Sequence, residues 1–173
     1  MTPFFIADLH LGHDNICKFL REDGTKLRPW DNVREMDEAL IDNFNSEVRD
    51  GDVIYFLGDI AMNEKGIASL KRFRGHKELI LGNHDNLKFT ELFNIFRRIT
   101  SQKKKHELMM THVPIHAGSF NQFRANIHGH LHHRKVLTPE GSVDPRYLCV
   151  SVEHTNYRPI SLDEVLVRLR GIQ

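Results

Sequence analysis

Short apolar runs that end in glycine or polar residues recur along the chain and predict buried strands. Residues 3–8 (PFFIAD), 52–59 (DVIYFLGD) and 77–85 (KELILGNHD) have this pattern. Runs of four to eight apolar residues bounded by turn-forming residues are typical of strands buried on both faces. Two later segments, 125–130 (ANIHGH) and 146–152 (RYLCVSV), are also predicted to be strands.

Helices are predicted between these strands. Residues 33–48 carry apolar side chains near helical spacing, which predicts an amphipathic helix, and either Asp31 or Asn32 can cap it. Further helices are expected at 65–73, 88–96 and 161–170.

The late part of the chain has a different pattern. Residues 97–112 predict a hairpin with Lys103, Lys104 and Lys105 near its solvated turn. Strands and helices alternate early, whereas later strands follow one another directly. We therefore expect an α/β fold with a mixed sheet, formed by one domain spanning residues 1–173.

Composition narrows the function classes. The chain has 173 residues and a formal net charge of +1, so charge alone does not favour nucleic acid as a partner. No apolar run approaches the ~18 residues of a membrane helix, and the start (MTPFFIADLH) has no signal-peptide pattern. The two cysteines are too few for a disulfide framework, which fits a cytoplasmic location.

Histidine is abundant, with twelve residues, and residues 127–133 (IHGHLHH) contain four of them: His128, His130, His132 and His133. Crowding groups that can all become cationic is unfavourable unless the stretch is a solvated loop or unless metal ions keep the imidazoles neutral as ligands. His128 and His133 are not assigned as ligands: His133 is expected at the surface, and His128 either supports the ligands from behind or is solvated.

Polar side chains end strand after strand: Asp8, Asp59, Asn83, His112 and His130. Binding sites in α/β folds form just beyond the carboxyl ends of the strands. We therefore expect these side chains to converge in one pocket. Because Asp8 and His10 are two residues apart, as are His130 and His132, an extended chain would point each pair the same way.

Five motif blocks occur in order between residues 8 and 132: DLH, GD, GNHD, TH and GHLH. In this ordered set the chain resembles the calcineurin-like metallophosphoesterases, and most of all their small bacterial and phage-type members. The resemblance implies two packed mixed β-sheets flanked by helices, a four-layer αββα sandwich.

The resemblance also implies a binuclear metal centre. One metal would be held by Asp8, His10, Asp59 and His132, and the second by Asp59, Asn83, His112 and His130, with Asp59 bridging the two. Carboxylate, amide and imidazole ligands without thiolate suit Mn, Fe, Zn, Ni or Mg, with manganese the first choice in vitro.

Such a centre hydrolyses phosphomonoesters or phosphodiesters, through attack by a hydroxide that bridges the metals. His84 is expected to assist the leaving group, and Asp85 either orients His84 or caps the next helix. Asn83, His84, His13 and Arg28 are the expected substrate contacts. Trp30 either stacks on a base or staples the following helix to the core.

The expected substrate is a small, nucleotide-like phosphoester, since the chain has no room for a large capping domain. A nuclease and a non-catalytic binding module on the same fold are the alternatives. Met62 stands where protein serine/threonine phosphatases of this superfamily carry an acid, which argues against that subgroup and leaves the partner of His84 open.

Overall fold

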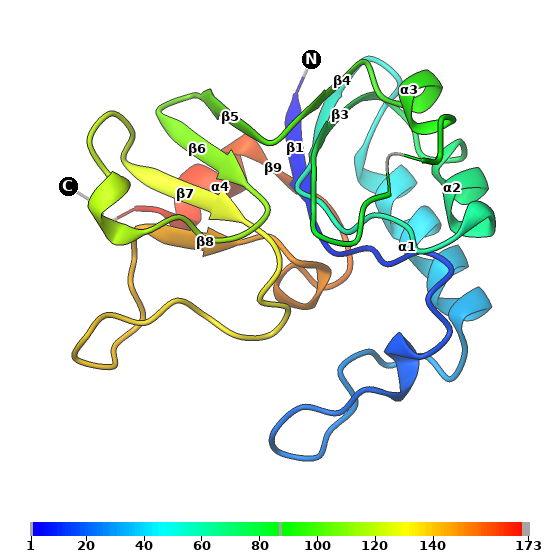
Figure 1. Ribbon diagram of the computed structural model, residues 1–173, viewed down its shortest axis with the longest axis horizontal. Coiled ribbons are helices and arrows are strands. Elements are labelled where there is room, and N and C mark those ends of the chain that lie inside the picture. The colour runs from blue at the N-terminus through cyan, green and yellow to red at the C-terminus, as the bar shows by residue number, and fades with distance from the viewer. Residues whose placement is uncertain (1, 87, 171–173) are drawn as a thin grey trace.

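The computed structural model describes residues 2–86 and 88–170, which form two mixed sheets (Figure 1). The first sheet has the strand order β4-β3-β2-β1-β9. Strands β1 to β4 are parallel, and β9 is antiparallel to β1. Its strands are β1 (Pro3–Ile6), β2 (Val53–Phe56), β3 (His76–Ile80), β4 (Arg98–Thr100) and β9 (Ile160–Ser161).

The second sheet has the order β5-β6-β7-β8, with β5 antiparallel to β6 and the other pairs parallel. Its strands are β5 (Gln102–Lys105), β6 (Leu108–Thr111), β7 (Ala125–His128) and β8 (Tyr147–Cys149).

The predicted hairpin over 97–112 is correct only in its second half. Strand β4 joins the first sheet, because its residues pair with β3, and only β5 and β6 form a hairpin. The three lysines lie within β5, near the turn as predicted, because Lys105 pairs with Leu108 directly across it. Lys103 forms an ion pair with Glu78 of the first sheet, so this strand helps to join the two sheets.

The helices are α1 (Val33–Glu47), α2 (Glu64–Leu70), α3 (Leu92–Ile95) and α4 (Leu162–Arg168), with short 3-10 turns η1 (Ile16–Lys18), η2 (Ala117–Ser119) and η3 (Val152–His154). Asn32 is the residue that caps α1, since its side chain accepts a hydrogen bond from the Glu35 N–H. The helix predicted at 88–96 is reduced to the four residues of α3.

Two apolar clusters hold the layers together. One cluster joins the first sheet to α1 and α2, where Phe44 packs against Phe56 and Phe73. The other lies between the two sheets, where residues such as Phe5 and Tyr55 meet Ile127, and it includes Val165 of α4. The predicted fold class is therefore confirmed: two packed mixed sheets are flanked by helices.

The sheets also meet through the backbone. The Ala7 N–H donates to the Val150 carbonyl at 3.0 Å, directly after β1 and β8. This contact brings the carboxyl ends of β1, β2 and β3 to the same edge as those of β6 and β7 (Figure 1). Within the described ranges, none of the helices combines the length and apolar character needed to span a lipid bilayer.

Candidate metal centre

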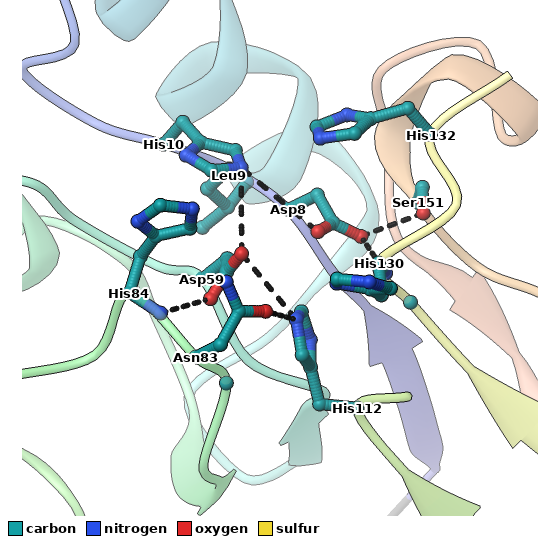
Figure 2. Close-up of polar contacts among 12 residues, drawn as sticks. Asp8, Leu9, His10, Asp59, Asn83, His84, His112, His130, His132 and Ser151 are labelled. Atoms are coloured by element: carbon teal, nitrogen blue, oxygen red, sulfur yellow. Dashed lines mark hydrogen bonds and ion pairs between the residues drawn. The ribbon is translucent and has the colours of Figure 1, made fainter. Parts of the chain in front are cut away.

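Two groups of acidic and histidine side chains lie beyond these strand ends (Figure 2). In each group the candidate ligand atoms lie within 4.8 Å of one another, so each could hold a metal ion. All the residues in them were predicted as ligands: Asp8, His10 and His132 in the first group, and Asp59, His112 and His130 in the second.

Asp59, a member of the second group, also lies close to the first. Its Oδ2 is 3.7 Å from His10 Nε2 in the first group and 3.3 Å from His112 Nε2 in its own. The side-chain oxygen of Asn83 is 2.9 Å from the same His112 nitrogen. Asp59 is thus placed to reach both groups, and Asn83 adjoins the second.

The backbone of the centre differs from the expected extended chain. Strand β1 ends at Ile6, before Asp8 and His10. The side chains of these two residues, and those of His130 and His132, are therefore not aligned by the alternation of an extended strand. Five residues of the centre have left-handed backbone angles: Asp8 (φ 58°), His10 (52°), Asp59 (53°), His130 (69°) and His132 (50°). A left-handed backbone conformation costs roughly 1–2 kcal/mol per non-glycine residue, and such residues cluster at functional sites. The orientation of these side chains is therefore obtained at the expense of folding stability.

Glycine allows the loops to approach each other closely. A Cβ on Gly129 would lie 2.6 Å from Asp8 Oδ2 and 2.7 Å from Ala7 Cβ, which is closer than real Cβ atoms come. The GHLH loop can therefore pass behind Asp8 only without a side chain at this position.

Unpaired buried atoms test whether the residues suit a cation. Asp8 Oδ2 accepts from Ser151 Oγ at 2.6 Å and from the His130 N–H at 2.9 Å. Asp8 Oδ1 and His10 Nε2 are buried without a hydrogen-bond partner among the described residues. Unpaired buried polar atoms are costly. These two atoms face each other across 3.9 Å, which suits a shared cation.

A second layer of contacts orients the imidazoles. His132 Nδ1 is 3.1 Å from Glu153 Oε1, and His112 Nδ1 is 2.8 Å from the Leu57 carbonyl. In each ring the other nitrogen is left for the centre, as is usual for histidines that bind metals. Glu153 and Ser151 were missed from the sequence, because both sit in or beside a predicted strand with no motif to mark them.

The expectation that Arg28 contacts substrate is wrong. Its side chain is fully buried and donates to the carbonyls of Asp8 and Leu9 and to Glu153 Oε1, the last at 3.0 Å. Arg28 therefore supports the centre from behind. Trp30 packs edge-on against Tyr157 with ring centroids 4.7 Å apart, which favours the staple over base stacking.

Asp85 fills neither of its two expected roles. Its carboxylate accepts backbone N–H groups of Gly82 (2.8 Å), Ile60 (2.9 Å) and Asp59 (3.0 Å). It therefore fixes the loop that carries Asp59, rather than orienting His84 or capping the next helix.

His84 is exposed and lies beside His10 and Asp59 (Figure 2). Its backbone N–H donates to Asp59 Oδ1 at 2.8 Å, and its ring lies 5.7 Å from that of His10. The ring of His13 is also close to that of His10, with centroids 5.6 Å apart. Both predicted substrate contacts thus adjoin the candidate ligands.

The two unassigned histidines lie apart from the ligand groups. His128 is buried with its Nδ1 2.7 Å from the Gly129 carbonyl, so it is not a solvated residue. His133 Nε2 pairs with Glu22 at 2.7 Å near the surface.

The carboxylates and imidazoles of the centre shift one another's pKa values. Burial opposes protonation of His112, but its hydrogen bond with Asp59 and the charges of Asp8 and Asp59 outweigh this and raise its pKa to about 8. Burial and the nearby Arg28 charge lower the pKa of His10 to about 2, so its ring stays neutral. Burial raises the pKa of Asp8 to about 6. Burial also opposes ionisation of Asp59, but its hydrogen bond and charge interaction with His112 outweigh this and lower its pKa to about 2. A bound cation would offset the burial of both carboxylates.

Fold and site together define a two-sheet α/β protein with two adjacent acid–histidine groups, each suited to a metal ion. No family model matches the chain. The uncharacterized protein MJ1445 of Methanocaldococcus jannaschii is 36% identical over 169 residues, covering 94% of this chain and 88% of the relative. The chain belongs to the same family as MJ1445. The Gene 66 protein of Mycobacterium phage L5 is 33% identical over 89 residues, which cover 49% of this chain and 40% of the phage protein.

Solved structures bear on the fold. The protein of unknown function AQ665 from Aquifex aeolicus superposes with a TM-score of 0.71 at 23% identity, over 96% of this chain and 98% of the other, so the two share a fold. An archaeal phosphodiesterase gives a TM-score of 0.47 at 17% identity, covering 87% and 82% of the respective chains, which is too low to establish a shared fold.

Proposed function

We propose that the chain is a metal-dependent phosphoesterase of the calcineurin-like superfamily, which hydrolyses small phosphomonoesters or phosphodiesters. The observation that carries the proposal is the position of Asp59 between the two acid–histidine groups. A carboxylate there is what two neighbouring divalent cations require, since their mutual repulsion must be offset. The ordered motif blocks in the sequence support the same reading.

Asp8, His10, Asp59 and His132 would hold one cation, and Asp59, Asn83, His112 and His130 the other. When bound, the two cations supply charge neutralisation for the phosphoryl oxygens and lower the pKa of a coordinated water. We expect manganese to serve in vitro.

The chain's own residues would then orient the reaction. Asp85 holds the Asp59 loop through three backbone hydrogen bonds, and the His84 N–H donates to Asp59. This contact fixes the backbone of His84 beside the centre, so its exposed imidazole can reach a bound phosphoester. We assign His84 to donating a proton to the leaving oxygen.

Metal reconstitution tests the proposal. Protein stripped with a chelator would be supplied with Mn, Ni, Zn, Fe or Mg and assayed with p-nitrophenyl phosphate and bis(p-nitrophenyl) phosphate. We expect no turnover in the stripped protein, turnover after metal is added, and two metal ions per chain by elemental analysis. Metal binding without hydrolysis of any phosphoester would instead identify a non-catalytic module.

A further inference from the structure

Phe19 and Leu20 form an exposed apolar pair at the foot of the 19–27 hairpin, which projects from the body of the molecule (Figure 1). Phe19 is 48% exposed and Leu20 62%, but Phe93 on α3 is 59% exposed as well. Single exposed apolar residues are normal on protein surfaces. Exposure therefore does not distinguish Phe19 from Phe93. What distinguishes Phe19 is the set of residues around it.

A row of ring contacts connects Phe19 to the candidate metal centre. Its ring meets the ring of His13 edge to face, with centroids 5.7 Å apart. His13 in turn lies 5.6 Å from His10, one of the candidate ligands. One imidazole therefore fills the interval between the centre and the exposed phenyl ring, and His13 Nδ1 is buried there without a partner among the described residues.

The hairpin holds Phe19 in place. The Leu27 N–H donates to the Phe19 carbonyl at 2.8 Å, and Leu20 pairs with Lys26 across the hairpin. Glu22 near the tip pairs with His133, which belongs to the same loop as His130 and His132. The backbone that carries Phe19 is thus held before any ligand binds, which lowers the ordering cost of binding.

We infer that Phe19, with His13 beside it, forms a subsite for a flat aromatic group of the substrate, as in the nucleobase of a nucleotide. The inference rests on the proposed function, which places the phosphate at the metals. A ribose lying alongside His13 would connect the phosphate at the metals to the base at Phe19. Because a phenyl ring offers a stacking face and no hydrogen bonds, the subsite selects an aromatic group without reading which base it is.

Adenosine 5′-monophosphate and ribose 5-phosphate differ only in the base, so their affinities isolate its contribution. Binding of each to manganese-loaded protein would be measured by calorimetry, and each would be tested as a competitor in the bis(p-nitrophenyl) phosphate assay. We expect the wild type to bind the nucleotide with roughly tenfold higher affinity than ribose 5-phosphate, which is a typical contribution of one stacked base. Guanosine and cytidine monophosphates should bind within about threefold of the adenosine compound, since stacking tolerates every base.

Phe19→Ala should bring the two affinities close together by weakening only nucleotide binding. Phe93→Ala, which removes a phenyl group of α3 that is at least as exposed, should keep the wild-type ratio. Equal affinities in the wild type, or a ratio that survives Phe19→Ala, would overturn the inference while leaving phosphoesterase activity intact. Failure of the proposed function would instead appear as absent turnover in the wild type, and calorimetry would still report on the aromatic subsite.

Discussion

Arg28 and Glu153 form an ion pair, 3.0 Å long, whose two side chains are completely shielded from solvent. The pair lies directly behind the centre, because Arg28 also donates to the carbonyls of Asp8 and Leu9, and Glu153 contacts His132. Burial opposes ionisation of Glu153, but the charge of Arg28 and the hydrogen bond from His132 lower its pKa to about 2. One buried pair therefore ties the first motif block to the last.

Replacing Arg28 by alanine should destabilise the fold strongly. Removing Arg28 leaves the buried Glu153 carboxylate with only its contact to His132, and breaking a buried ion pair costs roughly 3–5 kcal/mol. Urea unfolding of metal-free protein measures this. As a control, Arg72→Ala removes an exposed pair with Glu38 and should cost about 1 kcal/mol or less. Equal losses in the two variants would show that the buried pair has no special role.

Asp59→Asn should lose at least one of the two metal ions and abolish turnover, with little change in the shape of the protein. The amide keeps an oxygen to accept the His84 N–H but loses the charge placed between the two groups. Elemental analysis after dialysis against manganese should find at most about one ion per chain, against two in the wild type. Asp163→Asn changes an exposed acid of α4 and should bind two. Two tightly bound ions in Asp59→Asn would contradict the assignment of Asp59 as a bridge.

His84→Ala should retain both metal ions and lose catalysis in a way that depends on the leaving group. A general acid contributes about 10²–10⁴-fold, and most when the leaving oxygen is basic. We therefore expect a large fall in kcat with an alkyl phosphoester and a small one with a p-nitrophenyl ester. His76→Ala, at the amino end of β3 and hence at the opposite edge of the sheet, serves as the matched control. Full activity of His84→Ala on the alkyl ester would rule out proton donation by this residue.

Gly129→Ala should distort the centre, because the added methyl group would lie 2.6 Å from Asp8 Oδ2. Either the GHLH loop or Asp8 must move, so manganese affinity should fall and overpacking should cost about 1–3 kcal/mol. Gly51→Ala is the control, since its Cβ would meet nothing within 4 Å. Calorimetric titration with manganese measures the difference, and wild-type affinity in Gly129→Ala would show that the close approach is not needed.

Apolar patterning along the chain was enough to predict most strands and the long helix α1, because burial of apolar side chains at a fixed spacing depends mainly on local sequence. The predicted ends of the strands and helices were less accurate. Strand β1 ends at Ile6 rather than at residue 8, and β4 pairs with β3 in the first sheet instead of forming part of the predicted hairpin. Pairing between strands is a contact between distant segments, so a local pattern cannot specify which neighbour a strand takes.

The sequence by itself determined which side chains could form the centre, since the candidate ligands follow the strands in a recognisable order. Only the tertiary structure decided how they meet. Five residues of the centre have a left-handed backbone conformation: Asp8, His10, Asp59, His130 and His132. Arg28 is buried behind the centre, and the Asp85 carboxylate accepts hydrogen bonds from the loop that carries Asp59. These outcomes depend on contacts such as Arg28 with Glu153, whose partners are 125 residues apart. The physical reason is that burial and charge pairing act between segments that only folding brings together.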